Sequence, residues 1–183
     1  AENQTGATFL ASYAPSDFVL VELDAAPMPA DAFFSGWDRS GTAAASTVAI
    51  HHPSGDEKAI SFNTDAVTST DYFSSTVDAT ADHWRVDDWE DGTTEPGSSG
   101  SGLWDPDTHL LIGYLSGGQA ACGNSEYDCF GKLSVGWGLG ACCGASLIVI
   151  GALVGVDVAI LDADNAVCVL QHPMIVSDRQ HRA

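Results

Sequence analysis

The sequence predicts an all-β protein with the size of about one domain. Short apolar segments rich in Val, Ile, Leu, Phe and Trp alternate with turns rich in Gly, Ser, Asp and Pro. None of these segments has a convincing helical period. The chain has 183 residues and is 45% hydrophobic, so it can bury a core of the size found in one domain. Short strands separated by turns in this way form an antiparallel barrel or sandwich.

The first four predicted strands lie in the first third of the chain. Residues 17–24 are β-branched and aromatic, begin with a carboxylate and end at a Pro-containing connector. Residues 33–37 combine two phenylalanines with a tryptophan, and residues 46–50 follow a stretch of Gly, Ser and Ala. A turn with the sequence His-His-Pro-Ser-Gly-Asp then leads to a strand at residues 59–62.

Five further strands are predicted in the middle of the chain. Residues 68–80 are rich in Ser, Thr and Asp, which indicates a surface segment with a short strand at 72–73. The other four are apolar runs between turn signals, at residues 83–86, 103–104, 110–115 and 132–137.

The charge balance excludes one class of partner. The chain has 25 acidic and only 6 basic side chains, a formal net charge of -19. Nucleic-acid affinity comes largely from Lys and Arg, so nucleic-acid binding is excluded. The acidic surface has two interpretations, solubility and attraction of cationic substrates. Solubility is favoured, because a surface field acts on solubility and encounter rate before it acts on chemistry.

All five cysteines lie in the last third of the chain. Cys122 and Cys129 flank a short polar loop, which makes them candidates for a small disulfide in an oxidising compartment. Cys142 and Cys143 are adjacent and do not easily pair with each other, and the fifth is Cys168. An odd count leaves at least one thiol free or bonded outside this chain.

The composition changes at residues 138–156, a run of 19 residues without a charge. A helix of this length, at ~1.5 Å per residue, would just span a bilayer core of ~30 Å. A membrane anchor is therefore one interpretation. The alternative, which we favour, is a buried helix or strand pair, because five glycines weaken a helix and the basic flanks of the run are thin.

The strongest local signal for chemistry is the loop Gly97-Ser98-Ser99-Gly100. Such a loop places a serine in a tight turn while neighbouring backbone N–H groups face one point, as acyl transfer requires. Alone, a run of Gly and Ser is more typical of a flexible loop. Two other features give it context. Asp17 opens an apolar strand as a buried catalytic carboxylate would, and Ser116–Gly118 follows a strand and offers an edge where an extended peptide can pair.

Several ordered motifs together resemble a known family. They are Asp17–Leu23, Gly36–Asp38, Ile50–Asp56 with Lys58, Thr94–Ser101, and Asp128–Lys132 followed by Trp137. Over roughly residues 6 to 137 they resemble the bacterial lysyl endopeptidase branch of the trypsin-like serine proteases. The resemblance implies two packed antiparallel β-barrels, the first incomplete in this chain. It divides the chain into a protease domain, residues 1–137, and a tail, residues 138–183.

The resemblance also implies roles for individual residues. Ser99 corresponds to the nucleophile, and Asp17 to the carboxylate that orients the catalytic histidine. The backbone N–H groups of Gly97 and Ser99 would form the oxyanion hole. Asp128 corresponds to the acidic residue at the base of the primary specificity pocket, where a buried carboxylate binds Lys or Arg through charge-assisted hydrogen bonds.

The same resemblance predicts the substrate and the setting of the enzyme. Ser116, Gly117, Gly118 and Trp89 fall where the family lines its substrate cleft. The substrates would be polypeptides cut after Lys or Arg, without a cofactor, by a secreted or cell-surface enzyme. No metal site is expected, because the adjacent histidines at 51 and 52 point in different directions and lack other ligands at a suitable spacing.

The sequence departs from the family in two ways. No histidine precedes Asp17, so we expect the general base on a segment upstream of Ala1, together with most of the first barrel. His51 and His52 belong to a family turn and are not that base. Residues 1 to about 60 would then leave unpaired strand edges. The second departure is Ser98, where animal trypsins have an aspartate that captures a new N-terminus; the bacterial branch also lacks that aspartate.

Two functions therefore remain open. The first is a serine endopeptidase, with little or no activity in this chain alone. The second is a catalytically inactive homologue that acts as a binding module. Retention of Asp17, Gly97, Ser99 and Asp128 together favours the first, because a binding module does not need that whole set.

Overall fold

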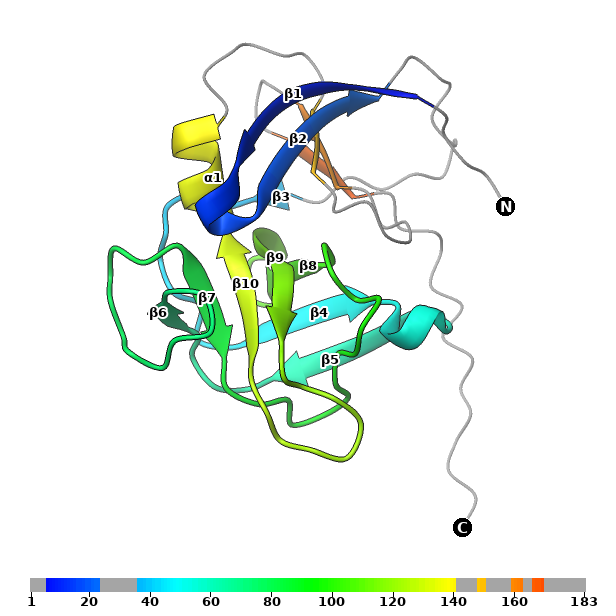
Figure 1. Ribbon diagram of the computed structural model, residues 1–183, viewed down its shortest axis with the longest axis vertical. Coiled ribbons are helices and arrows are strands. Elements are labelled where there is room, and N and C mark those ends of the chain that lie inside the picture. Colours follow the sequence, from blue (N-terminus) through cyan, green and yellow to red (C-terminus); the bar gives the residue numbers. More distant parts are fainter. Residues whose placement is uncertain (1–5, 24–35, 141–147, 151–158, 163–165, 170–183) are drawn as a thin grey trace.

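Two β-sheets make up most of the structure, which is a computed structural model (Figure 1). It describes residues 6–23, 36–140, 148–150, 159–162 and 166–169. Within these ranges there is a single α-helix, and every strand pairing is antiparallel except one. The prediction of an all-β fold is therefore confirmed.

The larger sheet has eight strands and carries most of the core. In spatial order, seven of them are β5 (Ala59–Asn63), β4 (Thr47–His51), β8 (Gly102–Asp105), β9 (Leu110–Gly118), β10 (Asp128–Lys132), β7 (His83–Val86) and β6 (Thr68–Thr70). The eighth, β3 (Gly36–Trp37), pairs in parallel with β9. Six of the eight lie on or close to predicted strands.

The centre of this sheet determines where the site lies. Leu103, Val86 and Phe130 are fully buried in one apolar cluster, as expected for strands that alternate between the two faces of a sheet. The central strands β9 and β10 pair so that Asp128 lies opposite Gly118. The start of β10 and the end of β9 therefore meet at one edge of the core.

The smaller sheet lies above the larger one in Figure 1. Its strands are β1 (Ala7–Tyr13), β2 (Phe18–Leu23), β11 (Ile148–Ile150), β12 (Ala159–Asp162) and β13 (Ala166–Val169). A short 3-10 helix, η1 (Ala14–Ser16), connects β1 to β2. β11 pairs with β2, through Val149 opposite Val21, so β2 has a neighbour on both sides, whereas β1 is an end strand of the sheet.

The apolar run at 138–156 falls largely outside the described residues. Residues 138–140 close the α-helix and residues 148–150 form β11. No helix within the part of the chain that the structure describes is long and apolar enough to cross a membrane.

The helix α1 (Leu133–Gly140) replaces most of the strand predicted at residues 132–137. Its packing explains the difference. Leu133 is fully buried, and a Cβ at Gly136 would lie 2.5 Å from the ring of Phe18, so glycine allows the helix to approach β2. The Trp137 ring lies 4.4 Å from that of Trp37. Tertiary contacts thus override a local pattern that suits a strand.

One other local prediction was wrong, and one strand was not predicted. Tyr72 and Phe73 form a turn, not a strand, and Phe73 has a φ of 58°, which no strand residue adopts. The neighbouring strand β6 ends at Thr70. Conversely, β1 was not among the predicted strands, although its sequence, Ala-Thr-Phe-Leu-Ala-Ser-Tyr, contains residues that favour a strand. It pairs with β2 in antiparallel register.

Candidate active site

The serine loop is a tight turn that ends beside β9. The N–H of Ser98 donates to Glu95 O at 3.0 Å, and the N–H of Ser101 donates to Ser98 O at 3.1 Å. The N–H of Gly100 donates to Leu115 O at 2.7 Å, which ties the turn to β9. Gly97 has a φ of 103°, a conformation that L side chains rarely adopt.

This pattern of hydrogen bonds leaves two donors available. Within the described residues, the N–H groups of Gly97 and Ser99 have no acceptor, and the Ser99 side chain is exposed. Two unbonded N–H groups in a turn next to an exposed hydroxyl can bind a developing oxyanion while that hydroxyl attacks a carbonyl carbon.

Two neighbouring segments hold the turn from outside. In the 3-10 helix η2 (Pro53–Gly55), the N–H of Ser54 donates to Pro96 O at 2.8 Å, and its hydroxyl donates to Glu95 Oε2 at 2.5 Å. The N–H of Cys122 donates to Glu95 Oε1 at 3.2 Å. These two hydrogen bonds lower the pKa of Glu95, Ser54 having the larger effect.

A buried histidine holds the turn from inside. His51 is the last residue of β4 and is completely buried. Its Nδ1 is hydrogen-bonded to Ser98 Oγ and its Nε2 to Ser61 Oγ, each at 2.9 Å. Burial, and secondarily the neighbouring His52, lowers the pKa of His51 to about 4. The imidazole is therefore neutral at physiological pH, and its partner is Ser98, not Ser99.

We expect this histidine to make the fold acid-sensitive. The unfolded chain takes up a proton near the ordinary His pKa of 6.5, whereas the folded chain does so only near 4. Between these values acid favours the unfolded state, so His51 should lower the free energy of unfolding by up to about 3 kcal/mol as the pH falls from 6.5 to 4.

Urea unfolding of the wild type and of His51→Asn, at pH 7 and at pH 4.5, tests this expectation. Carboxylates and the buried His83 contribute equally to the pH dependence of the free energy of unfolding in both proteins. The difference between the two pH dependences therefore isolates His51. The variant should lose less stability on acidification. An equal loss in both proteins would contradict the expectation.

The predicted specificity residue lies at the start of β10. Asp128 is 1% exposed, and its Oδ2 accepts hydrogen bonds from Trp89 Nε1 at 2.8 Å and from Thr94 Oγ1 at 2.6 Å. Burial raises the pKa of Asp128, while these two donors and the N–H of Ala120 oppose the shift. None of the three donors carries a positive charge. A cation entering here would find a buried carboxylate held by neutral groups.

The end of β9 brings the remaining predicted cleft residues to the same place. A Cβ at Gly118 would collide with Asp128 Oδ1, so only glycine fits opposite the carboxylate. At Gly117 a Cβ would lie 2.7 Å from the hydroxyl of Tyr72. On one side, Gly117 and Gly118 pair with β10; on the other, the pairing of β9 with β8 ends at Tyr114. That second side can accept an extended peptide.

Asp17 lies in the turn between η1 and β2, where its φ is 56°. Its side chain is exposed, contrary to the expectation of a buried carboxylate, because the tight turn places it outside the sheet. Partial burial raises the pKa of Asp17, and the hydroxyl of Ser116 opposes this. That hydroxyl is buried, and it makes no hydrogen bond of good geometry among the described residues.

These contacts connect the predicted residues around one end of β9. Gly100 binds Leu115, the residue before Ser116, and Thr94, just ahead of the serine turn, binds Asp128. In contrast, no histidine of the described residues is hydrogen-bonded to Ser99 or Asp17. His83 is buried with neither ring nitrogen bonded.

The sequence did not single out His51 as part of the site. Two signals pointed to it. The strand that it closes alternates buried and half-buried residues, so that Thr47, Ala49 and His51 face inward. In addition, the resemblance sets Ser98 where animal trypsins have an aspartate, and a polar side chain buried at that position needs a hydrogen-bond partner.

The predicted disulfide is not formed. Cys122 and Cys129 are both free thiols. Cys129 is fully buried in β10, opposite Arg85 of β7 and Gly117 of β9, whereas Cys122 is exposed in the loop that precedes β10. The short spacing in sequence therefore does not bring the two side chains to the same side of the structure.

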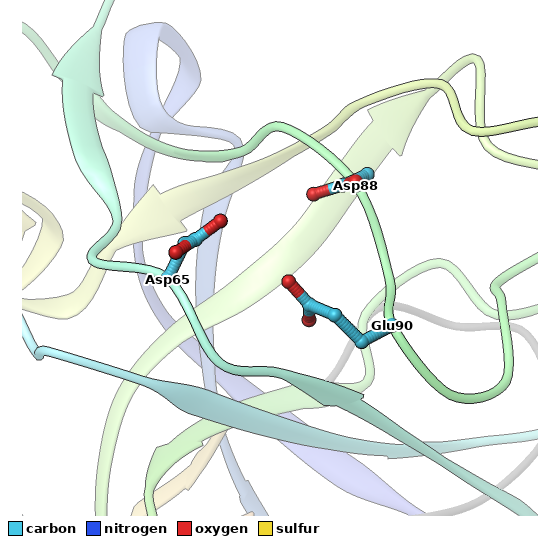
Figure 2. A group of neighbouring side chains, drawn as sticks. All are labelled: Asp65, Asp88 and Glu90. Atoms are coloured by element: carbon cyan, nitrogen blue, oxygen red, sulfur yellow. The ribbon is translucent and has the colours of Figure 1, made fainter.

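Three carboxylates form a separate cluster on the surface (Figure 2). One oxygen each of Asp65, Asp88 and Glu90 lies within 4.8 Å of the others. Figure 2 shows the three side chains turned toward one another from two loops. Asp65 and Glu90 are exposed, and Glu90 accepts a hydrogen bond from the N–H of Thr64. Exposed acidic groups alone do not make a metal site, and nothing else here points to a cation.

Comparisons with known proteins identify the family of the chain. The family model for the C-terminal domain of lysyl endopeptidase matches residues 1–131. Over 122 residues, the chain is 37% identical to a lysyl endopeptidase of Pseudomonas aeruginosa. The match covers 64% of this chain and 25% of that protein, so the chain spans about a quarter of the curated relative's length.

Proposed function

Because this chain belongs to the lysyl endopeptidase family, we propose that it carries the nucleophile and the specificity pocket of a serine endopeptidase that cleaves after Lys or Arg. The observation that carries the proposal is the arrangement around the end of β9. An exposed serine in a turn with two unbonded N–H groups lies there, together with a buried carboxylate held by neutral donors.

The chemistry would proceed through an acyl-enzyme. Ser99 Oγ attacks the peptide carbonyl carbon, and its proton passes to a histidine that Asp17 orients. The N–H groups of Gly97 and Ser99 stabilise the negative oxygen of the tetrahedral intermediate. Water then hydrolyses the ester on Ser99. We propose that the histidine comes from sequence outside this chain, since no described histidine is bonded to Asp17 or Ser99.

Substrate selection would depend on charge and on backbone pairing. The Lys or Arg side chain places its positive charge against Asp128, and the peptide backbone pairs with residues 116–118 of β9. The acidic character of the chain, with a net charge of -19, would raise the rate at which cationic peptides are encountered.

We also propose, from the family resemblance, that the enzyme acts outside the cytoplasm and that its protease domain ends at residue 137. Cys122 and Cys129 are free thiols and do not add support for an oxidising compartment. A membrane anchor in the tail stays a prediction.

One specific observation favours a second candidate function, that of an inactive homologue that binds cationic peptides. That observation is the missing contact between any described histidine and Ser99. A fluorophosphonate probe on the protein made from its complete gene separates the two candidates. A working protease should be labelled at Ser99 and be protected by a lysyl peptide, because labelling requires an activated serine. An unlabelled protein that still binds the peptide is a binding module.

A further inference from the structure

The residue before the nucleophile is anchored in the interior by a hydroxyl. Ser98 is 1% exposed, and its Oγ is 2.9 Å from His51 Nδ1. The same oxygen accepts the N–H of Glu95 at 3.3 Å. The Ser98 side chain therefore joins the start of the turn to a fixed point in the core.

His51 is suited to be that fixed point. Its backbone belongs to β4, where it pairs with Ala59 of β5. Its second ring nitrogen is bonded to Ser61, also on β5, and the side chain is completely buried. An imidazole held at both nitrogens cannot rotate without losing a buried hydrogen bond, which would cost about 1–3 kcal/mol.

The inward position of Ser98 decides the directions of its neighbours. Its own N–H points back into the turn, toward Glu95 O, and leaves the N–H groups of Gly97 and Ser99 without an internal acceptor. There is little space for the turn to shift, because a Cβ at Gly97 would lie 3.1 Å from the backbone nitrogen of Gly55. Release of the Ser98 side chain would free the peptide planes on both sides of it.

We propose that His51 is a positioning residue for acyl transfer, which through Ser98 holds the turn so that the N–H groups of Gly97 and Ser99 share one acceptor. This inference rests on the proposed function and assigns a purpose to the conformation of the turn. His51 touches no substrate. It replaces, with a neutral pair, the charged contact that an aspartate makes in animal trypsins.

Steady-state kinetics on the protein made from its complete gene test the inference. The variants are Ser98→Ala, which removes the hydroxyl, and His51→Phe, which keeps a ring without nitrogens. Loss of one oxyanion donor typically lowers kcat by about 10²–10³-fold, so partial misplacement of two should lower it by roughly 10–100-fold. KM and the inhibition constant of benzamidine, a ligand for the Asp128 pocket, should stay within about twofold, because that pocket is untouched.

Two further variants separate positioning from general damage. His51→Asn keeps a polar group near the place of Nδ1 and should restore most of kcat relative to His51→Phe. His52→Asn is the matched control, because His52 Nδ1 donates to Asp56 O at 3.1 Å and not to Ser98. Its kcat should stay within about twofold of the wild type. In the double variant of His51→Phe and Ser98→Ala, the losses should not add, because both changes break one contact.

Hydrogen exchange gives a measurement that does not depend on catalysis. The amide protons of Ser98 and Ser101 are bonded inside the turn, and in Ser98→Ala they should exchange at least about tenfold faster than in the wild type. A wild-type protein that hydrolyses no lysyl or arginyl substrate would overturn the proposed function, and exchange would still decide the positioning. Unchanged kcat and unchanged exchange in folded Ser98→Ala would overturn the inference, as would parallel losses of kcat and benzamidine binding.

Discussion

Replacement of Ser99 by alanine should abolish the hydrolysis of lysyl and arginyl peptides, with kcat/KM falling by at least about 10⁴-fold. The exposed hydroxyl is the only part of the side chain that the change removes, and without it no acyl-enzyme forms. Substrate binding should persist, because Asp128 and the edge of β9 are intact. The measurement is kcat/KM on a lysyl ester, together with the inhibition constant of benzamidine, for the protein from its complete gene.

Ser101→Ala is the matched control for this prediction. Its hydroxyl is buried two residues further along the same loop and has no hydrogen-bond partner within the described residues. Removal of an unpaired buried hydroxyl should leave stability unchanged or slightly higher. Equal losses of activity in Ser99→Ala and Ser101→Ala would show that the loop, and not the hydroxyl of Ser99, matters. Full activity of Ser99→Ala would refute the proposed nucleophile.

Replacement of Asp128 by asparagine should lower kcat/KM for lysyl and arginyl substrates by about 10³–10⁵-fold. The buried carboxylate receives hydrogen bonds only from neutral groups, so the substrate supplies the one positive charge. Asparagine has nearly the same shape but no charge, and it leaves the ammonium or guanidinium group of the substrate unpaired in a buried site.

The same change should not destabilise the protein. Burial raises the pKa of Asp128, which means that the folded state disfavours the ionised form. At pH 7 a neutral isostere removes this cost, so the Asn variant should unfold at the same or a higher urea concentration. A variant that loses activity but keeps or gains stability would mark Asp128 as a functional group.

Glu126→Gln is the control for Asp128→Asn, because it removes the same charge from an exposed residue two positions away. It should leave kcat/KM within about twofold of the wild type. If Asp128→Asn lost activity and stability together, the carboxylate would be structural. If neutral P1 residues were cleaved as well as Lys by the wild type, Asp128 would not be the specificity residue.

Much of the larger sheet could be predicted from sequence. β4, β5, β7, β8 and most of β9 are short runs of β-branched, aromatic or leucine residues between strong turn signals, and the structure places strands there within a few residues. These are cases in which local preference and the tertiary fold agree. The predicted site residues could also be named, because their motifs are ordered and well separated.

The remaining elements depend on contacts that the sequence does not display. The local pattern at residues 132–137 suits a strand, and tertiary contacts such as the close approach of Gly136 to Phe18 select the helix instead. β1 was not predicted as a strand, and in the structure it pairs with β2. Cys122 and Cys129 are seven residues apart in sequence, yet one is exposed and the other is buried in β10.

Strand patterning and motifs that are local in the chain were enough to predict the fold class, the family and the candidate residues of the site. How the serine turn is held depends instead on tertiary contacts. Ser98 and His51 are 47 positions apart, and their hydrogen bond exists because β4 and the turn before β8 pack around the same core. Contacts of this kind depend on the relative placement of distant segments, which no local pattern specifies.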